Sequence, residues 1–284
     1  MKSSGLFIGL STLDLIYLTQ NLPEPNQKIV ALDQTIAAGG PATNAAVTFS
    51  YLGSCATLLS AIGIHSMSQM ICSELETYAI KLIDLDPNRS ELPSISSIIV
   101  TQATGERAVI SVNATKFQAT SEQIPSDILE DVAIVLIDGH QMQVSYAIAQ
   151  QAKAKNIPIV IDGGSWKKGF ESILPYFDYA ICSDNFYPPN CQNQQEVLTY
   201  LQEIGIPHIA ITQGDRPIQY LNQGKKGEIE IPVVKAVDTL GAGDIFHGAF
   251  CHYILQNDFV RSLTLSAKIA SFSCQFFGTR QWMK

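Results

Sequence analysis

The sequence is poor in charged residues, and it contains neither a basic cluster nor a long apolar run. Asp, Glu, Lys and Arg make up 15% of the 284 residues, and the formal net charge is −8. A protein that binds a nucleic-acid backbone presents a basic face, so this class of partner is excluded. No uninterrupted apolar stretch approaches the roughly 18 residues of a membrane-spanning helix. We therefore expect a cytoplasmic protein with no nucleic-acid partner and no membrane partner.

Paired cysteines are absent as well. The six cysteines form no C-x-x-C pair, and the nearest two, Cys182 and Cys191, are nine residues apart. This spacing excludes zinc ribbons and thioredoxin-like redox motifs. Isolated cysteines in a chain with a large apolar core are typical of a reducing compartment.

The common nucleotide-binding motifs are missing too. There is no G-x-x-x-x-G-K-[ST] sequence, which excludes an ordinary P-loop, and neither HRD nor DFG of the protein kinases occurs. Gly241-Ala242-Gly243 begins like a dinucleotide fingerprint, but Asp244 and Phe246 follow in place of the third glycine, which disfavours a Rossmann dehydrogenase. His247 and His252 are five residues apart and do not share one helix face as metal ligands.

What the sequence does contain is an alternation of short apolar strands and helices. This pattern is typical of βαβ units, in which a mainly parallel sheet is covered by helices on both faces. The predicted strands are residues 5–10, 55–62, 133–138, 157–162, 179–182 and 208–212. The predicted helices are residues 42–52, 66–81, 145–155, 170–174, 196–204, 244–255 and 267–274.

Two segments, about 28–38 and 94–114, break this alternation. Both are rich in Val, Ile, Ser and Thr with alternating polarity, and the second predicts a hairpin of residues 97–101 and 107–112. We interpret them as a small β-sheet lid over a cleft. The alternative is that they are extra edge strands of the main sheet.

The turn at residues 238–243 precedes an apolar helical pattern that starts at Asp244. A glycine-rich turn before a helix leaves N–H donors unpaired at the positive end of the helix dipole, which makes an anion site. Asp244 can either cap this helix or accept a proton from a substrate hydroxyl. Because Asp238 or Thr239 can supply the cap, and the dipole should keep Asp244 ionised, we favour the role of a base.

Two motifs resemble the signatures of the ribokinase-like carbohydrate kinases of the phosphofructokinase B type. Asp238-Thr239-Leu240-Gly241-Ala242-Gly243-Asp244 resembles the C-terminal signature, and Ala38-Gly39-Gly40-Pro41-Ala42-Thr43-Asn44 resembles the N-terminal one. The resemblance implies a single ribokinase-like domain over residues 1–284, an α/β three-layer sandwich with a small β-sheet lid.

The resemblance also implies ATP-dependent transfer of the γ-phosphate to a hydroxyl of a small sugar or polyol, with Mg²⁺ and, in some relatives, a monovalent cation. A homodimer formed through the lid is also implied. The sequence pattern of residues 9–17 and 162–167 is similar to that of the ketohexokinase and sulfofructose-kinase branch.

The same resemblance assigns roles to individual residues. The catalytic group would be Asp244, with the anion hole formed by Gly241, Ala242 and Gly243. Sugar binding would fall to Asp14, Gly39, Gly40, Asn44 and Arg107, of which Arg107 lies in the predicted lid. The nucleotide would be contacted by Asn185, Thr212, Gly214, Thr239 and Gly278, near the small-residue helix 267–274 that would enclose adenine.

Some positions depart from the family pattern. The family usually carries an Asn-x-x-Glu motif that organises Mg²⁺, but here Asn185-Phe186-Tyr187-Pro188 has proline in place of Glu. The metal ligands therefore remain unassigned, with Asp184 as a candidate substitute. Pro217 stands where glycine is expected. Lys167 either faces the phosphates or is simply solvated.

Two further functions stay open from the residues. A nucleoside kinase of the same fold would need an aromatic sandwich, for which Phe7, Tyr17 and Phe117 are candidates. A catalytically silent sugar or nucleotide sensor is the other.

Overall fold

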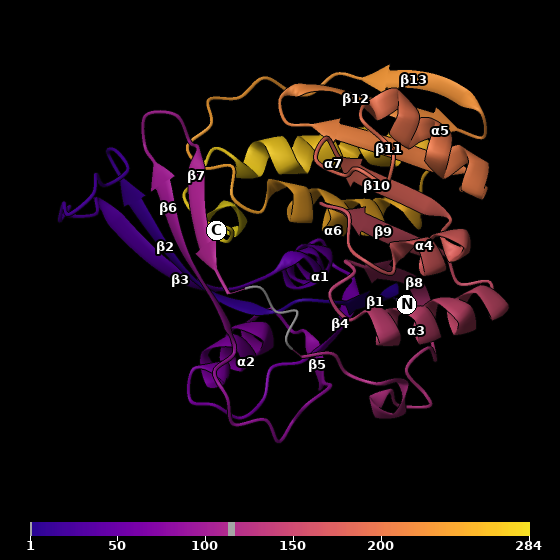
Figure 1. Cartoon of the computed structure of the whole chain (residues 1–284), viewed down its shortest axis with the longest axis horizontal. Helices are drawn as coiled ribbons and strands as arrows, with labels where there is room; N and C mark the ends of the chain where they lie inside the picture. Colours follow the sequence, from indigo (N-terminus) through magenta and orange to yellow (C-terminus); the bar gives the residue numbers. More distant parts are fainter. Residues whose placement is uncertain (1, 113–116) are drawn as a thin grey trace.

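The computed structural model describes residues 2–112 and 117–284, which form two sheets and their surrounding helices (Figure 1). The strands are β1 Ser4–Ile8, β2 Thr12–Thr19, β3 Asp33–Gly39, β4 Cys55–Ser60, β5 Lys81–Asp84, β6 Ser94–Thr101, β7 Arg107–Ser111, β8 Val132–Ile137, β9 Ile159–Gly163, β10 Tyr179–Ser183, β11 His208–Gln213, β12 Arg216–Asn222 and β13 Lys225–Ile229. The α-helices are α1 Pro41–Tyr51, α2 Ser68–Thr77, α3 Met142–Ala154, α4 Phe170–Ile173, α5 Gln194–Ile204, α6 Ala242–Ile254 and α7 Phe259–Ser273.

The large sheet has nine strands in the order β13-β12-β11-β10-β9-β8-β1-β4-β5. The seven strands from β11 to β5 in this order pair in parallel, and β12 and β13 add an antiparallel edge. The chain proceeds from β1 through β4 to β5 on one side and from β8 to β11 on the other. The topological switch point therefore lies between β1 and β8, where the carboxyl ends of open α/β sheets bind ligands.

Helices cover both faces of this sheet. On one face α3, α4 and α5 bury Ile148, Phe170 and Leu201 against the strands. On the other face α1, α2, α6 and α7 bury Phe49 and Phe250, among others. The predicted three-layer α/β sandwich with a mainly parallel sheet is confirmed.

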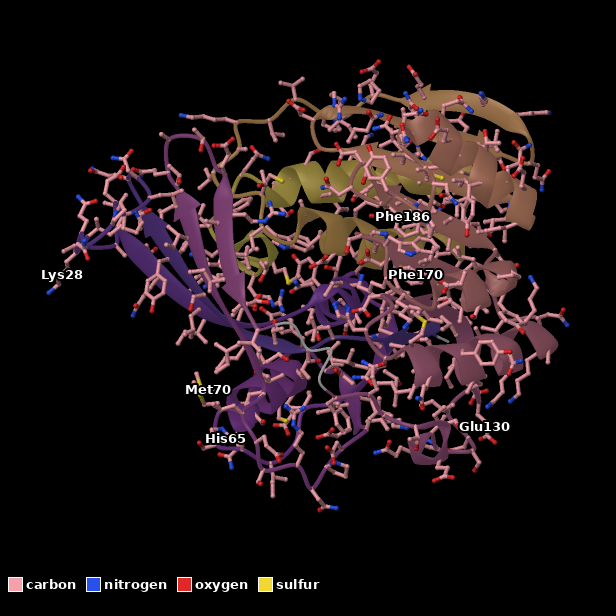
Figure 2. All side chains as sticks on the ribbon, viewed as in Figure 1. Lys28, His65, Met70, Glu130, Phe170 and Phe186 are labelled. Carbon is pink, nitrogen blue, oxygen red and sulfur yellow. The ribbon has the colours of Figure 1, made fainter. Side chains whose placement is uncertain are left out.

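Side chains inside the layers are closely packed, as the sticks of Figure 2 show around Phe170 and Phe186. The two rings are almost fully buried, with centroids 5.8 Å apart. Lys28 and Met70 lie at the periphery in the same view. No helix in the described part of the chain is long and apolar enough to cross a bilayer.

The small sheet has the order β3-β2-β6-β7 and projects from the body of the molecule (Figure 1). The interpretation of these segments as extra edge strands of the main sheet is wrong, because none of them pairs with it. The predicted hairpin is confirmed as β6 and β7. β3 begins at Asp33 rather than residue 28, and residues 113 and 114 of the predicted segment lie outside the described residues.

Several elements were not predicted or were predicted with wrong limits. β2 was missed, and Asp14 lies within this strand. The antiparallel pair β12 and β13 was missed too. The predicted helix 66–81 is wrong at its end, because Ala79 takes the left-handed φ of 54° and Lys81 starts β5. The other predicted elements are present with ends shifted by a few residues, except that α7 begins well before residue 267.

Candidate active site

The amino end of α6 has the unpaired donors that the sequence predicts. Gly241 occupies the N-cap position with φ 70° and offers no side chain to cap the helix. Across the described residues, the amides of Gly241, Gly243 and Asp244 find no hydrogen-bond acceptor, whereas the Ala242 amide donates to the Thr239 carbonyl oxygen at 3.3 Å. Gly243 is exposed. Three open amides at the positive end of a helix dipole form an anion site, which solvent reaches at Gly243.

The turn before α6 is held by Asp238 rather than capped by it. One carboxylate oxygen of Asp238 accepts the Leu240 amide and the other accepts the Gly278 amide, both at 2.8 Å. The suggestion that Asp238 or Thr239 caps the helix is therefore wrong. Asp238 instead joins the turn before α6 to the segment that follows α7, because it accepts the hydrogen bond of the Gly278 amide.

Asp244 meets Asn44 across the interface between α6 and α1. The Asn44 side-chain amide donates to Asp244 Oδ2 at 2.7 Å. The two helices approach closely because Gly248 of α6 lies directly against the Ala45 carbonyl oxygen of α1, where any Cβ would collide. One predicted site residue from each motif is thus in direct contact with the other, 200 positions apart in the chain.

The helix dipole, which was expected to keep Asp244 ionised, is opposed by the surroundings of this carboxylate. Burial, and next the nearby Asp162 carboxylate, raise the pKa of Asp244 from 3.8 to about 7. The Asn44 hydrogen bond and the charges of His247 and Arg107 act in the opposite direction but do not outweigh them. A carboxylate with such a pKa is well matched to proton transfer near neutral pH.

Asp162 and His247 belong to this site, although the sequence analysis gave neither a role. His247 is buried, and its Nδ1 lies 2.7 Å from the Gly243 carbonyl oxygen and 3.4 Å from Asp162 Oδ2. Its Nε2 lies 3.1 Å from the Ile181 carbonyl oxygen. The available signal was the position of Asp162 at the carboxyl end of an apolar strand, where parallel sheets collect polar groups.

The predicted sugar-binding residues gather around the start of α1. Asp14 points from β2 onto Gly39 of β3, where a Cβ would overlap its carboxylate. Burial raises the pKa of Asp14, and a 2.6 Å hydrogen bond from the Thr12 hydroxyl partly offsets this effect. Gly40, with φ 96°, lies against the Leu10 carbonyl oxygen in a conformation that favours glycine.

Arg280 contacts these residues, but it was not among the predicted sugar-binding residues. Its guanidinium donates to Asn44 Oδ1 at 2.9 Å and to Glu74 Oε1 at 2.8 Å, and it also donates to the Ala38 carbonyl oxygen. Glu74 in turn accepts the Ala38 amide at 2.6 Å. Arg280 therefore fixes both the Asn44 amide and the strand that leads into Gly39.

Arg107 of β7 contacts Thr239, in the turn before α6. Its guanidinium donates to the Thr239 hydroxyl at 2.9 Å and to the Thr239 carbonyl oxygen at 3.2 Å. The Thr239 hydroxyl donates to the Gly105 carbonyl oxygen at 3.2 Å. The tip of the small sheet is thus joined to the turn that precedes α6.

The remaining predicted nucleotide residues lie at the ends of β10 and β11. The Thr212 hydroxyl donates to the Cys182 carbonyl oxygen at 3.4 Å, and Gly214 has φ 68° in the turn that follows β11. Asn185 is exposed beside them. Asp184, the candidate substitute metal ligand, forms an ion pair with Arg216 through its Oδ2 atom at 3.0 Å.

One of the three aromatic candidates for base stacking in a nucleoside kinase is inaccessible to a ligand. Phe7 is completely buried in the core of the large sheet and cannot reach a ligand. Phe117 lies under the Arg89 guanidinium, 5.5 Å from the ring centroid. These positions remove Phe7 from the candidates for base stacking.

Comparisons with known proteins identify the family and the fold. The model of the pfkB family carbohydrate kinases matches residues 3–283. A deoxyribokinase of Salmonella typhi is 25% identical over 96% of this chain and 93% of its own length, and a ribokinase of Lactococcus lactis is 24% identical over 97% and 92%. A solved ribokinase of Thermotoga maritima superposes with a TM-score of 0.80 at 19% identity, covering 100% of this chain and 96% of that one. An Arabidopsis thaliana ribokinase complexed with ribose and ATP gives 0.76 at 18%, covering 100% and 99%. The chain therefore belongs to the pfkB family of carbohydrate kinases and is an ATP-dependent sugar kinase.

Proposed function

We propose that Asp244 accepts the proton of a hydroxyl on a small sugar while that oxygen attacks the γ-phosphorus of ATP. The new oxygen–phosphorus bond forms as the bond to the β–γ bridging oxygen breaks, and ADP leaves. The observation that carries the proposal is the Asp244 carboxylate beside three open amides. The amides stabilise the charge on the transferring phosphoryl group, and phosphoryl transfer asks chiefly for such alignment and charge stabilisation.

The acceptor would lie between the small sheet and the carboxyl edge of the large sheet. Asp14, Gly39 and Asn44 line this region and offer a carboxylate, an unobstructed backbone and an amide to sugar hydroxyls. The small sheet would act as a lid, since Arg107 already ties its tip to Thr239. A closed lid excludes water and so suppresses hydrolysis of ATP.

The residues present fit a Mg²⁺ ion held mainly by nucleotide phosphates. In residues 2–112 and 117–284 no cluster of three or more His, Cys, Asp or Glu side chains is arranged to hold a metal. The Asp162 Oδ2 atom is buried without a hydrogen bond, which leaves one carboxylate oxygen available. Mg²⁺ is commonly bound by one or two carboxylates together with phosphates and water. Asp162 would then hold the ion, which supplies charge neutralisation for the phosphates.

The small sheet would also mediate a homodimer. Its surface and the loop before β3 carry exposed apolar side chains, namely Val30, Leu32, Ile36, Val109, Ile110 and Val112. Exposed apolar side chains at this density are the kind that an interface between copies would cover. We expect light scattering to give a dimer mass, and a monomer at micromolar concentration would contradict this part of the proposal.

A coupled assay of ADP release tests the reaction. The acceptors are ketoses, aldoses, sugar phosphates and nucleosides, each with and without a chelator. We expect ADP release with at least one sugar and its loss when Mg²⁺ is removed. Absence of ADP release with every acceptor would favour a sugar or nucleotide sensor instead.

A further inference from the structure

Asn44 is a buried side chain, 3% exposed, whose two polar atoms face different partners. Its Nδ2 donates to Asp244 Oδ2 at 2.7 Å, and its Oδ1 accepts a hydrogen bond from the Arg280 guanidinium at 2.9 Å. The two ends of an amide have nearly the same shape, so the neighbours decide which end faces Asp244. A carboxyl group accepts hydrogen bonds when ionised and donates one when protonated, whereas a guanidinium only donates. Arg280 is therefore the partner that requires the amide oxygen of Asn44 on its own side.

The Arg280 guanidinium is fixed by further contacts besides the one to Asn44. Its Nε donates to Glu74 Oε1 at 2.8 Å, and another of its nitrogens donates to the Ala38 carbonyl oxygen. Its Cζ atom lies 5.6 Å from the centroid of the Tyr78 ring. The side chain is 11% exposed, so Arg280 and Glu74 form a largely buried ion pair. A planar guanidinium held in this way presents its donor to Asn44 in one direction only.

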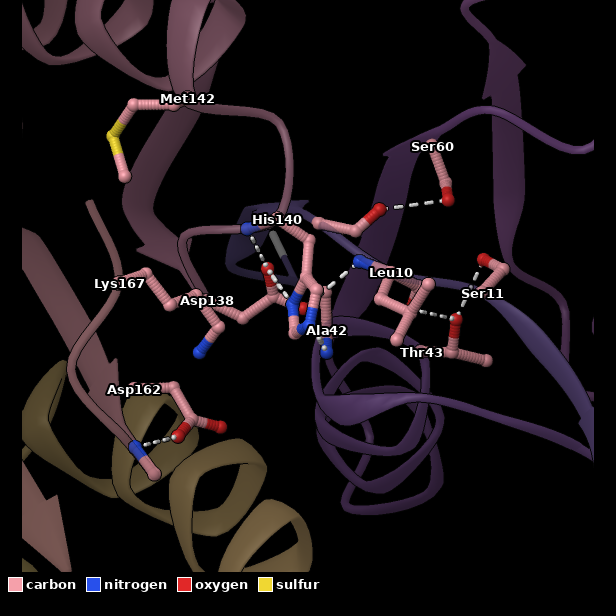
Figure 3. Close-up of polar contacts among 12 residues, drawn as sticks. Leu10, Ser11, Ala42, Thr43, Ser60, Asp138, His140, Met142, Asp162 and Lys167 are labelled. Carbon is pink, nitrogen blue, oxygen red and sulfur yellow. Dashed lines mark hydrogen bonds and ion pairs between the residues drawn. The ribbon is translucent and has the colours of Figure 1, made fainter. Parts of the chain in front are cut away.

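Other groups hold the backbone that carries Asn44. Figure 3 shows Asp138 beside Leu10 and Ala42, and its Oδ2 atom accepts their amides at 2.8 and 3.2 Å. The Thr43 hydroxyl donates to the Leu10 carbonyl oxygen at 3.1 Å. These contacts hold the first turn of α1, so Arg280 is left to decide the orientation of the side-chain amide.

The chain segment around Arg280 is attached on both of its sides. Before it, the Gly278 amide donates to Asp238 Oδ2 at 2.8 Å. After it, the buried Trp282 ring packs on Tyr51 of α1, with centroids 5.1 Å apart. The segment therefore keeps two attachments when the guanidinium is replaced.

We propose that Arg280 is a positioning residue for proton transfer, because it fixes the Asn44 amide with its N–H toward Asp244. The inference rests on the proposed function and deepens it. With Asp244 Oδ2 occupied by this donor, the proton of the acceptor hydroxyl passes to Oδ1, to which no residue in 2–112 or 117–284 donates a hydrogen bond. The O–H bond of the acceptor breaks as the Oδ1–H bond forms. An amide that turned would present its oxygen to a proton on Oδ2 and hold that proton away from the reacting oxygen.

The variant Arg280→Lys tests this role without leaving Glu74 unpaired. An ammonium can pair with Glu74, but it cannot reproduce the planar fork that also reaches Ala38 and Asn44. The matched control is Arg261→Lys, at an exposed position of α7. With the acceptor panel of the ADP-release assay, we expect Arg280→Lys to lower kcat about tenfold or more, because a misplaced reacting group can cost about 10²-fold. The KM for ATP should stay within about threefold of wild type, and Arg261→Lys should match wild type.

A double-mutant cycle separates positioning from a general loss of structure. The proteins are Asn44→Ala, Arg280→Lys and the double variant, and melting temperatures show that each is folded. If Arg280 acts through Asn44, Arg280→Lys lowers kcat by less than about twofold in the Asn44→Ala background, because the group that it orients is already gone. Losses that multiply in full would overturn the inference, and so would an unchanged kcat in Arg280→Lys. The same outcomes are required of Glu74→Gln, which weakens the hold on the guanidinium and serves where lysine is not tolerated.

Side-chain amide spectra of the ¹⁵N-labelled full chain test the contact without turnover. The Asn44 signal is assigned by its absence from the spectrum of Asn44→Ala. We expect this signal to move toward the position of solvent-exposed amides in Arg280→Lys and to stay in place in Arg261→Lys. A signal that does not move in Arg280→Lys would overturn the inference. Absence of ADP release by wild type with every acceptor would instead contradict the proposed function, and the spectra would still decide whether Arg280 orients Asn44.

Discussion

Replacement of Asp244 by Asn is expected to lower kcat by about 10³-fold or more. Asparagine keeps the shape of the side chain and an oxygen that can accept the Asn44 amide, now 2.7 Å from Asp244 Oδ2. What is lost is the ability to take a proton, and general-base catalysis commonly contributes about 10² to 10⁴-fold. The affinity for ATP should stay within about threefold of wild type, because the open amides of Gly241 and Gly243 are unchanged. Steady-state kinetics of ADP release and isothermal titration of ATP measure the two quantities.

The adjacent helix offers a matched control for this variant. Asp258 caps α7, where its Oδ1 accepts the Arg261 amide at 2.8 Å. Asparagine caps helices nearly as well as aspartate, so Asp258→Asn should leave kcat unchanged. A loss of only about tenfold in Asp244→Asn, or an equal loss in both variants, would remove Asp244 from the role of base.

The pH dependence of kcat/KM should show one ionisation near pH 7. The pKa of Asp244 is raised to about 7 by burial and by Asp162, and only the ionised form can accept a proton. The ionised fraction is nearly complete above pH 8 and falls tenfold for each pH unit below about 6. Activity at pH 5 is therefore expected to be about a hundredfold lower than at pH 8, provided that the protein is folded at both values.

The free energy of unfolding should depend on the ionisation of Asp244 with the opposite pH dependence to that of most carboxylates. The folded state holds the Asp244 proton up to about pH 7, whereas the unfolded chain releases it near the ordinary value of 3.8. Its contribution to the free energy of unfolding is thus complete below pH 4 and lost as the pH rises through 7. Melting temperatures of wild type should fall relative to those of Asp244→Asn over this interval. A pH-rate profile that stays flat down to pH 5 would contradict the raised pKa.

The local features of the site were predictable because they depend on short segments. The turn at 238–243 required glycine and ended in a helix, and Gly241 has the left-handed φ of 70° that this turn needs. The apolar strands of the parallel sheet were found from composition, since strands buried on both faces carry continuous Val, Ile and Leu. The strand β2 was missed because its serine- and threonine-flanked start reads as a loop, and its pairing with β3 and β6 is not local.

By itself the sequence determined the family motifs, the parallel α/β architecture and the choice of Asp244 as the candidate base. These follow from turn chemistry, hydrophobic periodicity and residue types within a few turns of one another. Only the tertiary structure decided the protonation of Asp244, the partnership of Asn44 with it, and the places of Asp162 and Arg280. Each of these depends on charges and dipoles brought together from segments far apart in the chain, and electrostatic interactions are set by distance and burial, which a linear sequence does not contain.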